Sequence, residues 1–298
     1  ILAGGDGTRL RSMTRAITGD NRPKQFVPVI GGMTLLDQTR RRVARSVARD
    51  RTLLVVTEKH RRFYQPLTKT ISPRLLLEQP QNKGTAPAIL YPLMRLAAKS
   101  PEAIVALFPS DHYFADDEEF MSHIDAAFDI VELQPATVTL LGITATSPET
   151  EYGWIEPQRS ILGRAKRSVT RVSRFWEKPN AKLAASLMER GCLWNSFVMV
   201  GRVDALLKMT RAALPELYSD FTAIAPTFES AAERKAVRAL YNRIKDSNFS
   251  HQVLAVRPQD LAVMRVEDVG WSDLGEPTRV LLTLARLGLQ SELAMSAS

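Results

Sequence analysis

The sequence predicts an α/β fold built on a mixed, mostly parallel sheet with helices on both faces. Four apolar segments have the length of buried strands: residues 52–57, 75–78, 103–108 and 137–143. Helix-length patterns separate them, at residues 35–47, 85–98 and 118–133. Because strands that alternate with helices usually lie parallel, this order predicts the fold class. The chain has 298 residues, 45% apolar and 24% charged, which suffices for a sizeable core.

The second half of the sequence is less regular. Strands are expected at residues 152–157, 169–177, 193–200, 251–256 and 261–266. Helices are expected at residues 181–190, 203–213, 216–224, 232–244 and 277–287. Since there is no Pro/Gly-rich linker, residues 1–298 are predicted to form one domain, with parts 1–145, 146–275 and 276–298. The first strand is expected to begin upstream of Ile1.

Charge and cysteine content exclude several classes of function. The net charge is +8, but the arginines are scattered, and the densest cluster, at residues 40–49, lies on an amphipathic helix whose charged face is expected to be solvated. We therefore expect no nucleic-acid partner. The single cysteine, Cys192, cannot form an intrachain disulfide, and no apolar run reaches the roughly 18 to 20 residues of a membrane span. These features favour a cytoplasmic protein that binds no membrane.

The start of the chain carries the residues of a phosphate-handling loop. An apolar entry leads into three glycines within residues 4–7, followed by Thr8 and Arg9, with Lys24 further along. Glycines allow backbone N–H groups to close around an anion, and Arg9 and Lys24 add fixed positive charge. The segment has no Walker ending in Gly-Lys-Ser/Thr, and it lacks the third glycine of a dinucleotide fingerprint. It therefore predicts phosphate binding by another type of loop.

Acidic residues at two strand or loop ends could hold a metal. Asp111 follows a buried strand, and Asp273 lies in a glycine-flanked loop. Two carboxylates from separate loops, together with substrate phosphates, are a common magnesium site, although a loop aspartate is more often a cap or turn former. His112 could be a ligand or a base, or could simply be hydrogen-bonded within the fold. The histidines show no zinc spacing.

Two further segments have both a functional and a structural interpretation. Glu177-Lys178-Pro179 is either a hydroxyl and phosphate contact or a surface turn. Trp194 is expected in the core, and Asn195 beside it could offer a donor and an acceptor to a sugar hydroxyl. From the residues alone these alternatives stay open.

Eight motifs together resemble those of the sugar-phosphate nucleotidylyltransferases, in that family's order. They lie at residues 2–10, 23–26, 84–88, 109–112, 152–153, 177–179, 194–196 and 270–275. The resemblance implies a Rossmann-like, glycosyltransferase-A-like nucleotidyltransferase fold, and is strongest to the guanylyltransferases that act on mannose 1-phosphate. It implies the reaction of GTP with mannose 1-phosphate to give GDP-mannose and pyrophosphate, with Mg²⁺ as cofactor.

The resemblance also implies roles for single residues. It assigns nucleotide binding to residues 1–145 and sugar-phosphate binding to residues 146–275. The expected catalytic residues are Arg9, Lys24 and Asp111. The expected nucleotide contacts are Leu2, Ala3, Gly4, Gly5, Gly7, Thr8 and Thr85. The expected sugar-phosphate contacts are Gly153, Glu177, Lys178 and Asn195. The expected Mg²⁺ ligands are Asp111 and Asp273.

The sequence departs from the family pattern in three places. Residues 79–84 differ near the base, Phe197 replaces a glycine after the sugar contact, and no C-terminal β-helix domain is expected. The first departure leaves UTP or dTTP with glucose 1-phosphate as an alternative substrate pair. A non-catalytic sensor of nucleotide sugars is a second alternative. The oligomeric state, including a homo-oligomer, stays open.

Overall fold

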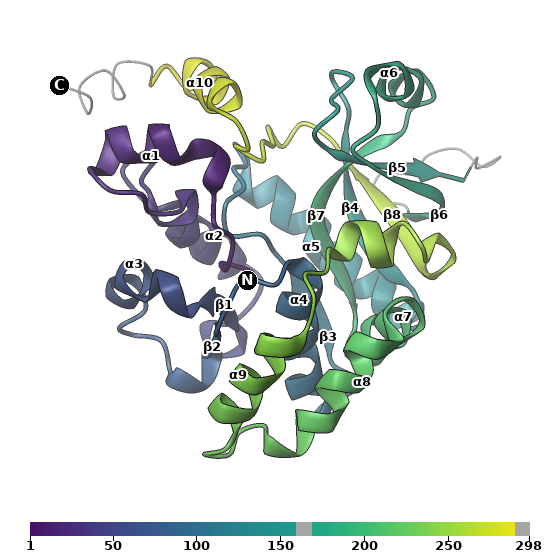
Figure 1. Cartoon of the computed structure of the whole chain (residues 1–298). Coiled ribbons are helices and arrows are strands. Elements are labelled where there is room, and N and C mark those ends of the chain that lie inside the picture. Colours follow the sequence, from purple (N-terminus) through teal and green to yellow (C-terminus); the bar gives the residue numbers. More distant parts are fainter. Residues whose placement is uncertain (159–168, 290–298) are drawn as a thin grey trace. The chain divides into compact units, whose positions relative to one another are not determined.

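The computed structural model describes residues 1–158 and 169–289 (Figure 1), so the predicted tail beyond residue 289 lies outside the described residues. The strands are β1 (Leu54–Thr57), β2 (Leu76–Gln79), β3 (Ile104–Leu107), β4 (Val138–Thr144), β5 (Gly153–Pro157), β6 (Val169–Glu177), β7 (Leu193–Arg202) and β8 (Leu261–Val266). The α-helices are α1 (Arg11–Thr18), α2 (Leu35–Val43), α3 (Arg61–Tyr64), α4 (Thr85–Ala97), α5 (Asp117–Leu133), α6 (Ala181–Glu189), α7 (Val203–Ala213), α8 (Pro215–Ile224), α9 (Glu233–Arg243) and α10 (Pro277–Arg286). Shorter helical turns used below are η1 (Thr8–Leu10), η2 (Lys24–Phe26) and η8 (Ser250–Leu254).

The described chain divides into two compact units. Unit 1 contains residues 1–82, 109–118 and 269–289, and unit 2 contains residues 83–108, 119–158 and 169–268. These boundaries do not coincide with the predicted one at residue 145. The organisation as a single domain stays a prediction.

Unit 1 brings the chain start beside two other segments. Strands β1 and β2 pair in parallel, and Leu2 forms parallel bridges to both Val55 and Pro109. The glycine loop and Ser110-Asp111 therefore follow neighbouring parallel segments, as the sequence predicts for a ligand site at strand ends. The core below them is apolar and includes Leu10, Val27, Val29, Ile30, Leu35, Tyr113, Leu274, Val280 and Leu284.

Unit 2 contains a six-stranded sheet in the order β3-β7-β4-β8-β6-β5. Strand β5 also pairs with β7, so β7, β4, β8, β6 and β5 form a closed five-stranded barrel. Gly142 lies at a bulge in β4, where a Cβ would come within 2.7 Å of Val263 Cγ2 and 2.8 Å of Leu193 Cδ1. Glycine at this position leaves room for both side chains.

The prediction of a mostly parallel sheet needs correction. The α/β class and the mixed sheet are confirmed, but a mostly parallel sheet is not. Only β1 with β2 and β4 with β8 run parallel, whereas the other five pairings between labelled strands of the described chain are antiparallel. Helix α6 separates β6 from β7, and α7, α8 and α9 separate β7 from β8, yet β6 and β7 pair antiparallel with their sheet neighbours. Alternation of strands and helices therefore does not imply parallel pairing in the second half. Helices on both faces stay a prediction.

The predicted strand at residues 251–256 is wrong, because this segment forms the helical turn η8. Side chains favour the turn: Asn248 Oδ1 accepts from His251 N at 2.9 Å, and Gln252 Oε1 accepts from Asn248 N at 2.7 Å. Such local hydrogen bonds compete with extended pairing. Unit 1 also contains helices α1 and α3, which we did not predict.

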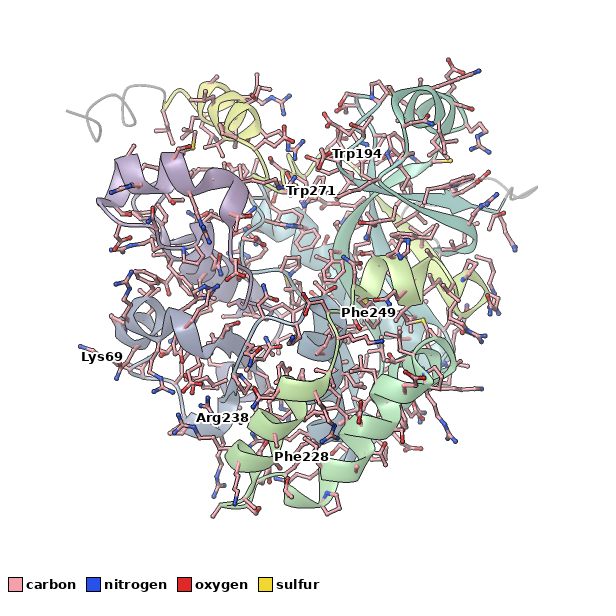
Figure 2. All side chains as sticks on the ribbon, in the orientation of Figure 1. Lys69, Trp194, Phe228, Arg238, Phe249 and Trp271 are labelled. Carbon is pink, nitrogen blue, oxygen red and sulfur yellow. The ribbon has the colours of Figure 1, made fainter. Side chains whose placement is uncertain are left out.

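Helices α4, α7, α8 and α9 pack on one another in unit 2. Aromatic rings join them, since Tyr91 lies 6.3 Å from Phe221 and 5.7 Å from Phe228, which Figure 2 labels. No helix of the described chain is long and apolar enough to cross a membrane.

Candidate functional site

The glycine loop of unit 1 makes a left-handed turn and enters a helix. Gly7 has φ 56°, and a Cβ there would lie 3.1 Å from Lys24 N, so the loop passes close to the lysine backbone. The turn leads directly into η1 and α1, while the Thr8 and Arg9 side chains are exposed. Leu2 and Ala3 anchor the loop, since Ala3 is buried and its N–H donates to Val55 O at 2.7 Å.

Asp6 fixes the same loop through its carboxylate. Its oxygens lie 2.6 Å from Lys59 Nζ and 3.1 Å from His60 Nε2, and Asn82 Nδ2 donates to it at 3.0 Å. Burial acts to raise the pKa of Asp6, but Lys59, Asn82 and His60 together hold it below its ordinary value. The one carboxylate of the loop is thus neutralised by its neighbours.

Lys24 is buried and meets oxygen atoms from two other segments. Its Nζ lies 3.3 Å from Asp111 Oδ2, donates to Leu274 O at 3.1 Å, and also donates to Asp273 O. Three predicted site residues, Lys24, Asp111 and Asp273, are therefore brought together within unit 1. A buried ammonium held by this many oxygens has a fixed position.

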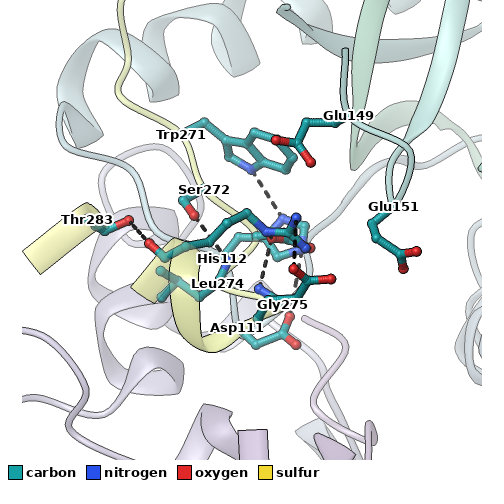
Figure 3. Close-up of polar contacts among 12 residues, drawn as sticks. Asp111, His112, Glu149, Glu151, Trp271, Ser272, Leu274, Gly275 and Thr283 are labelled. Atoms are coloured by element: carbon teal, nitrogen blue, oxygen red, sulfur yellow. Dashed lines mark hydrogen bonds and ion pairs between the residues drawn. The ribbon is translucent and has the colours of Figure 1, made fainter. Parts of the chain in front are cut away.

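The loops that carry Asp111 and Asp273 are paired to each other by backbone hydrogen bonds. Tyr113 N donates to Ser272 O at 2.9 Å, and Ser272 N donates to Tyr113 O at 3.0 Å. Beside them Trp271 Nε1 donates to His112 Nδ1 at 3.3 Å, as Figure 3 shows. Burial is the main cause that lowers the pKa of His112, and Lys24 adds to it, so the imidazole is neutral and its Nδ1 accepts a hydrogen bond from Trp271 Nε1–H. His112 therefore has a structural hydrogen bond.

Asp273 carries a negative charge that its surroundings stabilise. Its Oδ1 accepts from Gly275 N at 2.8 Å and lies 2.8 Å from Arg279 Nε. Burial alone would raise the pKa of Asp273, but Lys24, His112 and Arg279 lower it below the ordinary carboxyl value. No sequence signal pointed to Arg279, because its pairing depends on how α10 packs.

The donor set at Asp111 and Asp273 fits a hard divalent cation that keeps some of its water. Both side chains are carboxylates, and the Asp111 side chain is 29% exposed. Within the described residues, no group of three or more His, Cys, Asp or Glu side chains is arranged so that it could hold a metal ion. Mg²⁺ commonly uses one or two carboxylates together with substrate phosphates, and this arrangement suits that use.

In unit 2 the structure brings together Gly153, Glu177 and Asn195. Gly153 pairs with Glu177 across β5 and β6, and a Cβ on it would lie 3.1 Å from Glu177 Oε2 and 3.3 Å from Asn195 Cβ. Glu177 Oε2 is buried and has no hydrogen-bond partner among the described residues. Burial raises the pKa of Glu177, although Lys178 and His251 oppose the shift. A buried carboxyl oxygen without a partner in the protein can accept a hydrogen bond from a hydroxyl group of a ligand.

Trp194 lies in the core, as predicted. Its ring packs edge-on against Tyr152 at 5.1 Å and against Trp154 at 6.2 Å, and Figure 2 labels it. Asn195 Oδ1 accepts from Phe197 N at 3.0 Å, and Phe197 has φ 59°. Phe197, which stands where the family usually has glycine, therefore occupies a backbone conformation that usually favours glycine.

Lys178 and Thr85 already have partners within unit 2. Lys178 Nζ lies 3.0 Å from Glu151 Oε2, and both side chains are partly exposed. Thr85 Oγ1 accepts from Phe249 N at 2.8 Å. Gly84 has φ 85°, and a Cβ there would overlap Ser247 O and lie 2.9 Å from Ser247 C. This close approach explains why the chain has glycine at position 84, where it differs from the family pattern.

Comparison with known proteins finds relatives along almost the whole chain. The family model described as nucleotidyl transferase matches residues 1–285. The Xanthan biosynthesis protein XanB of Xanthomonas campestris pv. campestris (strain B100) is 30% identical over 94% of this chain and 58% of its own length. The mannose-1-phosphate guanylyltransferase of Salmonella montevideo is 28% identical over 92% of this chain and 57% of its own. The chain thus spans somewhat more than half the length of these curated relatives.

Solved structures share the fold. A Thermus thermophilus protein, described as mannose-1-phosphate geranyltransferase, has a TM-score of 0.77 and 28% identity, covering 92% of this chain and 75% of its own. A UDP-glucose pyrophosphorylase complexed with UDP-glucose has a TM-score of 0.56 at 13% identity, covering 96% of each chain, a likeness in fold alone. With its family model, relatives and structural neighbours in agreement, this chain belongs to the sugar-phosphate nucleotidyltransferase family.

Proposed function

We propose that the chain transfers the guanylyl group of GTP to mannose 1-phosphate, giving GDP-mannose and pyrophosphate. The observation that carries the proposal is the position of Lys24, whose backbone N lies beside Gly7 of the glycine loop and whose ammonium contacts the Asp111 carboxylate and the Asp273 carbonyl. The name of the Salmonella montevideo relative supports the choice of substrates.

The reaction needs no nucleophile from the protein. A phosphate oxygen of mannose 1-phosphate forms a bond to the α-phosphorus of GTP while the bond to the pyrophosphate oxygen breaks. Positioning and charge neutralisation then supply the catalysis. We assign the triphosphate to the glycine-loop N–H groups and Arg9, and charge stabilisation at the reacting phosphates to Lys24.

We propose that Asp111 and Asp273 hold Mg²⁺. When bound, the ion would neutralise phosphate charge and orient the triphosphate. The loops that carry the two carboxylates are paired by backbone hydrogen bonds between Tyr113 and Ser272, which supports the assignment.

We assign the sugar to Gly153, Glu177 and Asn195. The buried Oε2 of Glu177 supports this role, since a sugar hydroxyl would provide the donor that the described protein residues do not. Lys178 would contact the phosphate of the sugar phosphate. To do so, its ammonium must leave the Glu151 carboxylate with which it is paired.

The second candidate is the same chemistry with UTP or dTTP and glucose 1-phosphate. The observation that favours it is the segment 79–84 next to Thr85, which departs from the guanylyltransferase pattern where the base is expected. Pyrophosphate release measured for each triphosphate with each sugar phosphate separates the two. Release fastest with GTP and mannose 1-phosphate supports the proposal, and a higher rate with another pair refutes it. Binding of GDP-mannose without magnesium-dependent pyrophosphate release would instead indicate a sensor.

A further inference from the structure

Three consecutive carbonyl groups of the glycine loop are held by buried side chains. Gln25 Nε2 donates to Ala3 O at 3.1 Å and to Gly5 O at 2.8 Å. Thr57 Oγ1 donates to Gly4 O at 2.9 Å. Gln25 is 1% exposed and Thr57 is fully buried, so these donors face the loop from the protein interior.

The backbone N–H groups of the same loop are not held in this way. Among the described residues, no backbone carbonyl accepts a hydrogen bond from the backbone N–H groups of Gly4 through Thr8. Carbonyl oxygens carry partial negative charge and repel phosphate, whereas N–H groups attract it. Holding the carbonyls inward therefore fixes the polarity that the loop presents to an anion.

Gln25 is placed by the same turn that places Lys24. In η2, Phe26 N donates to Pro23 O at 2.9 Å and Val27 N donates to Lys24 O at 3.0 Å. One turn thus orients the loop peptides through Gln25 and meets the Asp111 and Asp273 loops through Lys24. Neither contact is visible from spacing along the sequence.

We propose that Gln25 is a positioning residue for the nucleoside triphosphate. Its amide keeps the Ala3 and Gly5 carbonyls turned inward, so that backbone N–H groups meet the phosphates. The inference rests on the proposed function, because it assumes that the loop binds a triphosphate.

The test replaces Gln25 by methionine, which preserves length and apolar volume but has no donor. Gln38→Met is the matched control, since Gln38 Nε2 also donates to two backbone carbonyls, Ile30 O at 2.7 Å and Met33 O at 3.1 Å, and has no part in the proposed site. Calorimetric titration with GTP should show a dissociation constant about tenfold higher for Gln25→Met than for Gln38→Met. Affinity for mannose 1-phosphate should be the same in both variants.

Equal GTP affinity in the two variants would overturn the inference, as would equal losses for GTP and mannose 1-phosphate. If Gln25→Met does not fold, Thr57→Val replaces it. That variant must lose GTP affinity while Thr57→Ser, which keeps the hydroxyl, retains it. A wild-type protein that binds UTP or dTTP instead of GTP contradicts the proposed base, and the Gln25 comparison is then made with that triphosphate. A wild type that binds no triphosphate overturns both proposals.

Discussion

Replacing Lys24 by methionine should abolish most of the activity while leaving the fold intact. The ammonium has three oxygen partners in the structure, one at 3.1 Å and one at 3.3 Å, and the lysine is 7% exposed. Removing one preorganised electrostatic contact from a reacting centre typically costs about 2.7 to 4 kcal/mol of transition-state stabilisation, or roughly 10² to 10³ in turnover. Leaving its oxygen partners without a donor costs about 1 to 3 kcal/mol of unfolding free energy. That cost is smaller than the usual stability of about 5 to 15 kcal/mol.

The assay is pyrophosphate release at saturating GTP and mannose 1-phosphate, with circular dichroism to confirm folding at the assay temperature. Lys99→Met serves as the control, because Lys99 pairs with Glu229 in unit 2 and has no part in the proposed site. Lys24→Arg keeps the charge but changes its position, and it should also lose turnover. Wild-type turnover in folded Lys24→Met would remove this residue from the catalytic site and refute the reasoning.

Three further predictions concern buried groups. Burial raises the pKa of Glu177, so the folded state binds its proton more tightly than the unfolded state does. Wild-type stability therefore falls as pH rises from the ordinary carboxyl pKa through the raised one. Glu177→Gln should gain thermal stability relative to wild type as pH rises through that window, and a difference that stays constant with pH would be contrary evidence. Gly84→Ala should cost about 2 to 4 kcal/mol in urea unfolding, since φ is 85° and a Cβ would overlap Ser247 O; unchanged stability would contradict the described backbone. Asp117→Asn should cost about 3 kcal/mol. It should cost more than Arg42→Met, because it leaves the 2% exposed Arg42 charge unpaired and without water, whereas Arg42→Met leaves Asp117, which is 34% exposed and can hydrate. The reverse order of the two costs in urea unfolding would show that the buried charge is not the cause.

Much of the fold was predictable because its elements carry strong local patterns. The helix at Ala181–Glu189 is preceded by Asn180, whose Oδ1 caps Leu183 N at 2.9 Å, and followed by Gly191 with φ 73°. The segment Leu54–Thr57 is buried throughout and forms the expected strand. The barrel was not predictable, since it depends on β5 pairing with both β6 and β7, which is a choice among partners distant in sequence.

The candidate site was predictable in its residues more than in its contacts. The motifs identified Lys24, Asp111 and Asp273, and the structure brings these three together. The roles of Gln25 and Arg279 were not apparent, because each depends on a contact between segments that only folding creates. Glu177 was identified, but its burial, which gives it its altered pKa, was not.

The most direct test of the central claim is a competition in one reaction. The protein is incubated with Mg²⁺, equal concentrations of GTP, UTP and dTTP, and equal mannose 1-phosphate and glucose 1-phosphate, and the nucleotide sugars are separated and quantified by mass. The account predicts that GDP-mannose is the dominant product and forms in step with pyrophosphate. Dominance of another nucleotide sugar, or no nucleotide sugar at all, would contradict it.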